Sequence, residues 1–314
     1  MRTFRDKTAV MTGGASGIGL ALAKACASRG MDIVLADIEV GSLEAAAERL
    51  GSQGTEVLAV PTDVSRLEQV EALAARAYDR FGKVHLLFNN AGVATGTSIW
   101  ETSASDWDWV MGVNYGGVLN GIRAFVPRML AQGEDAHIVN TASVGGLVSY
   151  HPCATYQVSK HTVVALSEHL YHSLSLKRAR IGVSVLCPGW VRTRILEAER
   201  NRPADGQASA LTAEERIVRE HFARAVEEGM APELIAEITL DAVQRGQFYV
   251  LPDPRWKGMI QQRMEDLLAE RTPSSLGTLA NFLDDNGVVA RLAVNHWRET
   301  VRDWLRRTFK RDTR

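Results

Sequence analysis

The sequence has little of what marks secreted, membrane-spanning or disulfide-rich proteins. It contains only three cysteines in 314 residues, Cys26, Cys153 and Cys187, and they show no paired spacing. An odd number of scattered cysteines argues against a disulfide framework and a zinc site, and favours reduced thiols. No apolar run reaches the length of about 18 residues that a membrane-spanning helix needs. The short N-terminal segment meets an apolar strand too soon for a signal peptide, so we expect a cytoplasmic protein.

An excess of charge of one sign is also lacking. The chain has 36 Lys and Arg against 37 Asp and Glu, a formal net charge of −1. This balance predicts no general attraction for nucleic acid. The length suits one large α/β domain or two small ones, and there is no internal repeat or low-complexity tract.

What the sequence does contain is a regular alternation of short apolar runs and amphipathic segments. The runs predict strands at 7–12, 33–36, 57–60, 84–88, 137–141, 181–187 and 248–251. The segments predict helices at 17–29, 42–50 with Ser42 as N-cap, 65–81, 105–131, 154–176 and 232–245. Such alternation favours right-handed βαβ units and a parallel sheet covered on both faces. The predicted fold class is therefore α/β, a Rossmann-type doubly wound parallel sheet in a single domain.

A glycine-rich turn joins the first strand to the first helix. Gly13, Gly17 and Gly19 follow the spacing G-x-x-x-G-x-G, in the strand-to-helix context that a dinucleotide fingerprint requires. The glycines let the backbone approach a pyrophosphate, and the helix N-terminus supplies N–H groups and a partial positive charge. The alternative is a plain glycine-rich turn.

Asp37 favours the dinucleotide interpretation over that alternative. It lies 18 residues past Gly19, at the end of the second strand, where a carboxylate hydrogen-bonds the adenosine ribose hydroxyls. A carboxylate there repels a 2′-phosphate, and neither Ser16 nor Ile38 beside it is basic. The sequence therefore predicts NAD rather than NADP as the cofactor, against the alternative of a solvated loop acid.

Ser143, Tyr156 and Lys160 form the candidate catalytic set. Tyr156 and Lys160 are four residues apart and share one face of a predicted helix. A nearby ammonium lowers the pKa of a phenol from its usual value of about 10, which suits it to proton exchange with an alcohol or carbonyl oxygen. Ser143 is expected to hold that oxygen. By itself, a Tyr and a Lys at this spacing are common on a helix surface.

Taken together, these motifs resemble the short-chain dehydrogenase/reductase family over about residues 5–251. The matching residues are Thr12-Gly13-x-x-x-Gly17-Ile18-Gly19, Asp63-Val64, Asn89-Asn90-Ala91-Gly92, Asn114, Ser143, Tyr156-x-x-x-Lys160 and Pro188-Gly189-x-Val191-x-Thr193. The resemblance implies that Asp63 and Val64 meet the adenine, and that Asn90, Ala91 and Gly92 line the central cofactor cleft. It places Pro188, Gly189, Val191 and Thr193 beside the nicotinamide. It also implies that Lys160 binds the nicotinamide ribose, and that Asn114 holds a water linking Lys160 to solvent.

The predicted activity is NAD-linked oxidation of a secondary alcohol, or the reverse reduction, with Tyr156 as general acid/base. An NADPH-dependent ketoreductase and a non-catalytic NAD-sensing scaffold are the alternatives. The expected substrate wall is apolar with aromatic edges: Thr95, Val144, Tyr150, Trp190 and Ile195, beside Ser143 and Tyr156. It favours a bulky hydrophobic or aromatic alcohol, although Tyr150 and Trp190 can equally be packing residues. His151 and Cys153 are interpreted as pocket-edge residues.

Segments 106–114 and 125–130 resemble bacterial short-chain enzymes that include the Cα-dehydrogenases of lignin-type aryl ethers. Residues 1–251 are predicted to form the NAD-binding and catalytic domain, with a mobile lid at about 190–230 that contains the loop-like stretch 201–210. The family's pairing of the helices at 105–131 and 154–176 implies a homodimer or homotetramer. Residues 252–314 are predicted to form a helical extension. Its segment 287–314, with eight Lys/Arg and three Asp/Glu, is expected to pack on a subunit or, alternatively, to touch a membrane surface.

Overall fold

The computed structural model describes residues 1, 3–95, 99–149, 153–204, 206, 211 and 213–273. Three predictions fall outside these residues: the substrate role of Tyr150, the pocket-edge position of His151, and the amphipathic helix at 287–314. Among the described helices, none is both long and apolar enough to cross a membrane.

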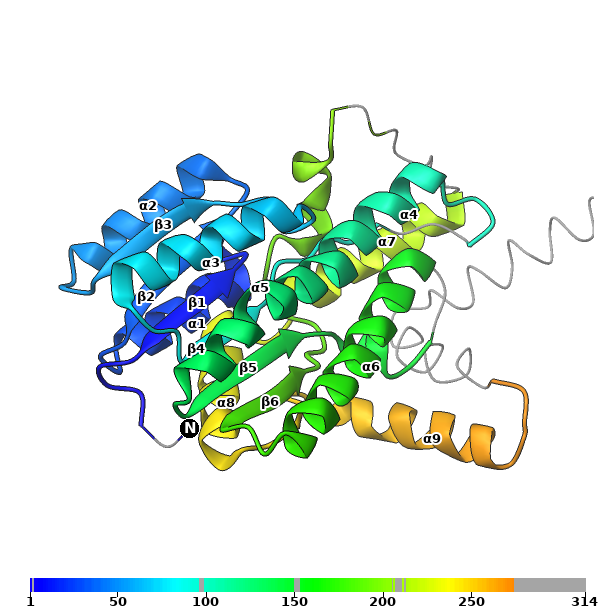
Figure 1. Ribbon diagram of the computed structural model, residues 1–314. Coiled ribbons are helices and arrows are strands. Elements are labelled where there is room, and N and C mark those ends of the chain that lie inside the picture. Colours follow the sequence, from blue (N-terminus) through cyan, green and yellow to red (C-terminus); the bar gives the residue numbers. More distant parts are fainter. Residues whose placement is uncertain are drawn as a thin grey trace, which may run out of the picture.

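Seven parallel strands form a single sheet in the order β3-β2-β1-β4-β5-β6-β7 (Figure 1). They are β1 (Thr8–Thr12), β2 (Asp32–Asp37), β3 (Val57–Pro61), β4 (Leu86–Asn89), β5 (Ala136–Thr141), β6 (Ile181–Leu186) and β7 (Tyr249–Val250). The order reverses between β1 and β4, and such a switch point opens a ligand crevice at the carboxyl ends of the strands. The predicted doubly wound α/β fold is confirmed.

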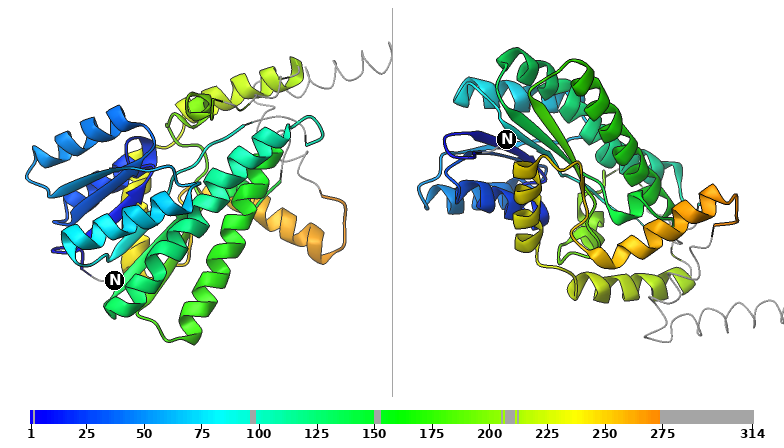
Figure 2. Two further views of the ribbon diagram at one scale, coloured as in Figure 1. Left: turned by 45° about the horizontal axis from the view of Figure 1, so that its top comes forward. Right: turned by 90° about the horizontal axis from the view of Figure 1, so that it is seen from below.

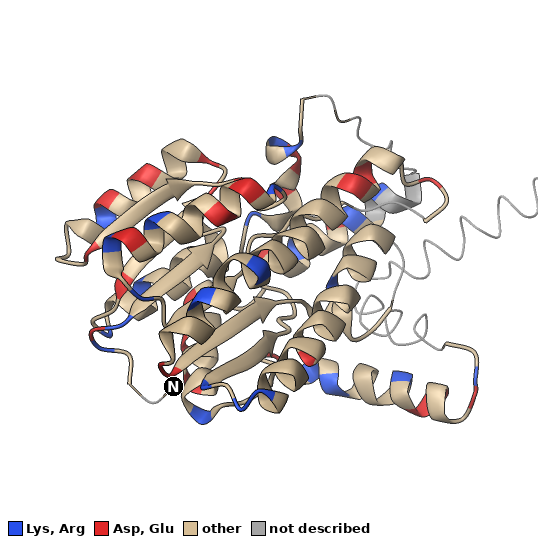
Figure 3. Cartoon of the chain, in the orientation of Figure 1, with Lys and Arg blue, Asp and Glu red and all other residues tan. Residues whose placement is uncertain are grey.

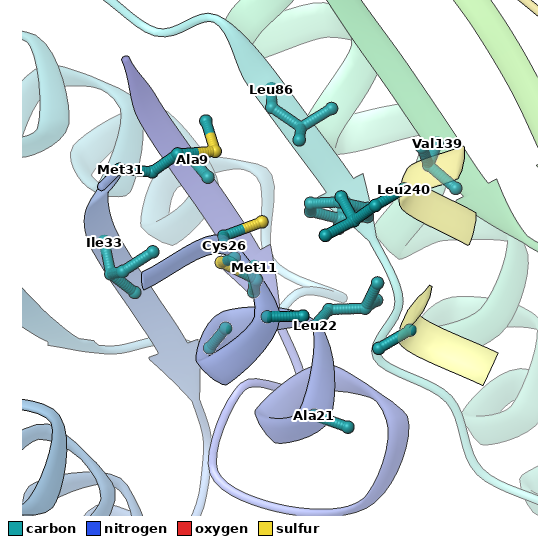
Figure 4. Packing of buried hydrophobic residues seen from close by; sticks show 14 of the residues in the cluster. Ala9, Met11, Ala21, Leu22, Cys26, Met31, Ile33, Leu86, Val139 and Leu240 are labelled. Carbon is teal, nitrogen blue, oxygen red and sulfur yellow. The ribbon is translucent and has the colours of Figure 1, made fainter. Parts of the chain in front are cut away.

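Helices cover both faces of the sheet (Figure 1). The helices α1 (Gly17–Ala27), α2 (Val40–Gly51) and α8 (Pro232–Arg245) bury their apolar residues in one core. The helices α3 (Leu67–Phe81), α5 (Gly117–Gln132) and α6 (Ala154–Leu176) do so in a second core on the other face. In Figure 4, Leu22 and Cys26 of α1 and Leu240 of α8 pack beside Met11, Ile33 and Leu86 of the strands. Each such leucine or isoleucine contributes about 1.5–3 kcal/mol on burial. Charged residues lie mainly on the outer helices and loops (Figure 3).

The bounds of α6 and α8 agree with the sequence prediction, but the start of α2 does not. The helix begins at Val40, so Ser42 lies within its first turn rather than at the N-cap, and its Oγ donates to Glu39 Oε2 at 3.4 Å. The Asp37 carboxylate accepts the Glu39 N–H at 3.0 Å, which organises the chain before Ser42 is reached. Ser42 as N-cap was therefore wrong.

The predicted helix at 105–131 is interrupted in the structure. It consists of α4 (Ala104–Met111), a π-helical turn η1 (Gly112–Gly116) and α5. The π-helical turn is centred on Asn114. Such turns are rare and occur frequently at functional sites, and apolar periodicity does not signal them. The interruption places the wider turn at the residue predicted to act with Lys160.

The segment between β6 and β7 contains two helical elements besides α8. They are η3 (Ile195–Asn201), a 3₁₀ segment, and α7 (Ala213–Glu227). After β7 follow the short η4 (Pro254–Trp256) and α9 (Lys257–Leu268). Figure 2 shows α7 and α9 outside the sheet rather than against its two faces. We refer to η3 and its flanking residues, 194–203, as the strap.

Candidate active site

The glycine-rich turn after β1 is packed so closely that a side chain at Gly13 or Gly19 would collide with neighbouring backbone atoms. Gly13 has a φ of +64°, and a Cβ on it would lie 2.9 Å from the Ala91 Cα. A Cβ on Gly19 would overlap the carbonyl oxygen of Gly13. The helix α1 can therefore begin close against the strand only because both positions are glycine. This cradle fits a dinucleotide pyrophosphate at the N-terminus of α1.

Asp37 stands at the end of β2 and fixes the adjoining rim. Its Oδ2 accepts the Ala15 N–H at 3.0 Å, and its Oδ1 accepts the Glu39 N–H at 3.0 Å. Burial raises the pKa of the Asp37 carboxyl, and these backbone hydrogen bonds act in the opposite direction. The side chain is thus oriented before any ligand arrives, as a ribose-binding carboxylate requires.

Hydrogen bonds at the ends of β1, β4 and β5 position the middle of the site. Thr12 Oγ1 accepts the N–H groups of Asn90 and Ala91 at 2.9 and 3.1 Å. Asn90 Nδ2 donates to the Thr12 carbonyl at 3.2 Å, and its Oδ1 accepts from Thr141 Oγ1 at 3.3 Å. The turn 90–92 is therefore tied to its two neighbouring strands.

Ser143, Tyr156 and Lys160 converge where β5 meets α6. The ammonium of Lys160 lies 5.6 Å from the centre of the Tyr156 ring and donates to the Thr141 carbonyl at 3.0 Å. Burial lowers the pKa of Lys160 to about 8. Burial also raises the pKa of Tyr156, while a hydrogen bond with Ser143 lowers it. Burial thus works against the expected lowering of the Tyr156 pKa by Lys160, and that lowering stays a prediction.

Asn114 lies behind this group and is fully buried. Its Oδ1 accepts the Val93 N–H at 2.8 Å, and its Nδ2 donates to the Val93 carbonyl and to Ser159 Oγ at 3.0 and 2.9 Å. A Cβ on Gly92 would lie 3.3 Å from both Asn114 Oδ1 and Lys160 Nζ. Gly92 therefore leaves the space between the Asn114 amide and the Lys160 ammonium open.

One cavity of about 580 Å³ brings most of the predicted residues together. On the cofactor side it is lined by Gly13, Ser16, Gly17, Ile18, Asp37, Ile38, Asp63, Val64, Asn90, Ala91, Gly92, Pro188, Gly189, Val191 and Thr193. The predicted residues on the other side of the lining are Ser143, Val144, Cys153, Tyr156, Lys160, Trp190 and Ile195. Gly19 and Asn114 lie beneath this lining. Thr95 is not among the lining residues, and its Oγ1 instead hydrogen-bonds Thr155 Oγ1 at 3.0 Å.

Three aromatic residues in the cavity wall were missed by the sequence analysis. Trp109 of α4, Phe222 of α7 and Trp256 of η4 all line the cavity and are nearly buried. The Trp190 ring lies 5.0 Å from Phe222 and 6.2 Å from Trp256, between centroids. No motif or spacing signals these positions, since they come from elements far apart in the sequence.

The strap lines the cavity and is anchored at both of its sides. On the cofactor side, Arg200 Nε and Asn201 Nδ2 donate to Glu39 Oε1 at 2.7 and 3.0 Å. On the other side, Arg202 Nη2 donates to the buried Asp106 Oδ1 at 2.6 Å, and its guanidinium stacks 4.4 Å from the Trp109 ring centre. Residues 200–202 therefore link the two halves of the cavity wall.

A family model described as short chain dehydrogenase matches residues 7–204. The chain belongs to the short-chain dehydrogenase/reductase family. A short-chain dehydrogenase/reductase from Burkholderia phymatum, solved in complex with NAD, shares 46% identity with a TM-score of 0.85, over 87% of this chain and 98% of that one.

Two further family members bear on the subgroup. The Cα-dehydrogenase of Sphingobium sp. strain SYK-6 is 33% identical over 87% of this chain and 89% of its own length. A short-chain dehydrogenase structure from Novosphingobium aromaticivorans shares 32% identity with a TM-score of 0.73, over 98% of this chain and 99% of that one. The resemblance to Cα-dehydrogenases drawn from 106–114 and 125–130 is confirmed.

Proposed function

We propose that the protein is an NAD-dependent dehydrogenase that interconverts a bulky hydrophobic or aromatic secondary alcohol and its ketone. The observation that carries this proposal is the shared cavity, which is lined both by Ser143, Tyr156 and Lys160 and by residues of the dinucleotide fingerprint. A proton-exchanging group and a hydride acceptor must meet the same carbon–oxygen bond, and one cavity supplies both positions.

The cofactor is NAD, and the glycine cradle with Asp37 and Asp63 would hold it. When bound, it supplies the hydride acceptor or donor that no protein side chain provides. The Asp37 carboxylate favours a ribose with free hydroxyls over one carrying a 2′-phosphate. This charge is the reason to prefer NAD over the NADPH-dependent ketoreductase. The NAD complex of the Burkholderia phymatum relative supports the same choice.

The protein's own residues handle the proton. Ser143 holds the reacting oxygen, and its Oγ is itself held by the Gly145 N–H at 3.1 Å. Tyr156 takes the proton from the alcohol, or returns it to the ketone. The ammonium of Lys160 favours the phenolate of Tyr156, and the Asn114 turn provides the outward path for the proton. Retention of all four residues argues against a non-catalytic scaffold.

The aromatic wall supports a bulky substrate. Trp109, Trp190, Phe222 and Trp256 present rings that pack on flat apolar groups, and burying such a group contributes about 25 cal/mol per Å². A small aliphatic alcohol would leave most of this wall unfilled. The name of the Sphingobium Cα-dehydrogenase is consistent with this choice. We also propose a cytoplasmic homodimer or homotetramer, with 1–251 as the catalytic domain and 252–314 as an extension whose Trp256 completes the substrate wall.

A panel of secondary alcohols incubated with NAD tests the proposal, with NADH formation followed by absorbance. Aryl, steroid and terpene alcohols are compared with small aliphatic ones at matched concentrations. We expect kcat/KM to be highest for a bulky aromatic alcohol and at least about tenfold lower for the small ones, the equivalent of 1.4 kcal/mol of lost contacts. Absence of NADH with every alcohol would contradict the proposed activity, and a preference for small alcohols would contradict the substrate class.

A further inference from the structure

Glu39 lies two residues beyond Asp37 and is held by side chains from the strap. Besides the hydrogen bonds from Arg200 and Asn201, its Oε2 lies 3.8 Å from Arg194 Nη1. Partial burial would raise the pKa of Glu39, but the hydrogen bonds from Asn201 and Arg200 lower it. A charged carboxylate therefore sits between two guanidinium groups at the rim of the cofactor cavity.

Both guanidinium groups line the same cavity as Asp37 and Glu39. An arginine fork beside the adenosine ribose is the chemistry that binds a 2′-phosphate. The sequence offered no such group, because neither Ser16 nor Ile38 is basic and the strap lies more than 150 residues away. The fold brings two arginines to this corner, and one carboxylate engages both.

Arg200 is committed to this arrangement by further contacts. Its Nη1 donates to the carbonyl oxygens of Arg194 and Glu197 at 3.1 and 2.9 Å, which fixes the guanidinium on the strap. Arg194 is less committed, since its side chain is half exposed and its other partner is the exposed Glu197 at 2.8 Å. Loss of the Glu39 carboxylate would thus leave the positive charges of Arg194 and Arg200 unbalanced at the cavity rim.

We propose that Glu39 is a second cofactor-specificity residue, which withholds Arg194 and Arg200 from the 2′-phosphate position of the adenosine ribose. Asp37 excludes the phosphate by repulsion, and Glu39 excludes it by engaging the cations that would bind it. The inference rests on the proposed NAD-dependent function and extends it to the strap.

Binding titrations test the proposal, with the fluorescence of NADH and NADPH measured separately on wild type and variants. Glu39→Gln keeps the shape and one acceptor oxygen but removes the charge that holds the two guanidinium groups. We expect it to tighten NADPH binding about tenfold, the equivalent of 1.4 kcal/mol, and to change the Kd of NADH by less than about threefold. Adding Arg194→Gln and Arg200→Gln together should cancel the gain for NADPH. Glu237→Gln controls for net charge and should change neither Kd. Glu237 forms an ion pair with Arg29 at 2.6 Å, and neither residue lines the cavity.

Each other outcome is decisive. Unchanged NADPH binding by Glu39→Gln, with NADH binding intact, would overturn the role of Glu39 but not the proposed function. A gain that survives removal of both arginines would also overturn it, because lost repulsion alone would then explain the effect. Loss of NADH binding by Glu39→Gln would make Glu39 a structural clamp instead. Failure of the wild type to bind NADH would contradict the proposed function itself, and the inference with it.

Discussion

The two walls of the cavity are built in different ways. The cofactor wall consists of backbone turns at the ends of consecutive strands, at Gly13, Asp37, Asp63 and Asn90. The opposite wall consists of side chains from α4, the strap, α7 and η4, which lie far apart in the sequence. A wall of backbone tolerates almost no change in shape, whereas a wall of side chains can change to suit a different alcohol. The fold can therefore keep its cofactor cradle while the substrate wall changes.

The comparison predicts that the cofactor wall is the more fragile one. In Gly19→Ala, the added methyl group would overlap the Gly13 carbonyl oxygen and push the turn away from the pyrophosphate position. We expect the Kd of NADH to rise about 100-fold, near the upper end of the 1–3 kcal/mol that overpacking costs. Calorimetric titration measures it. Gly41→Ala is the matched control, because a Cβ on Gly41 meets nothing within 4 Å. A Gly19→Ala protein that binds NADH normally would contradict the backbone account.

The substrate wall should respond to truncation without loss of the cofactor. Phe222→Ala removes a ring that lines the cavity and packs at a tilt against Trp190, with ring centroids 5.0 Å apart. We expect kcat/KM for a bulky aryl alcohol to fall about tenfold, since burying such a ring contributes roughly 1.5–3 kcal/mol. The Kd of NADH should stay within about twofold, because Phe222 belongs to the substrate wall and the glycine cradle is unchanged. Steady-state kinetics with Leu267→Ala as control, an exposed residue of α9, separate the effect from a general loss of stability.

The pH dependence of turnover should be set by Tyr156, which lies between the two walls. It should be opposite for alcohol oxidation and ketone reduction. Alcohol oxidation requires Tyr156 without its proton, and burial holds the Tyr156 pKa above the usual value. Oxidation should therefore speed up several-fold as the pH is raised from about 7, and ketone reduction should slow down over the same range. Lys160→Met should shift the pH profiles of both oxidation and reduction to higher pH, because the ammonium that favours the phenolate is gone. Parallel pH profiles in the two directions would contradict the role of Tyr156.

The same contrast explains what could be predicted from the sequence. The strands, the helices α6 and α8, and the cofactor residues follow from local patterns: apolar runs, glycine spacing and acidic residues at strand ends. The start of α2 was misplaced because the Asp37 carboxylate organises the turn before Ser42. The π-helical turn at Asn114 leaves no trace in the apolar periodicity. Trp109, Phe222, Trp256 and Arg200 meet the cavity only through tertiary packing, so no local pattern could identify them.

The most direct test of the central claim separates proton transfer from cofactor binding at one residue. Tyr156→Phe keeps the ring and its packing but removes the hydroxyl group, and Tyr171→Phe changes an exposed Tyr on the same helix as control. With NAD and the best alcohol, we predict that Tyr156→Phe loses about 10²–10⁴-fold in turnover, while its Kd for NADH stays within about twofold of wild type. A Tyr156→Phe protein that keeps most of its turnover would contradict the account.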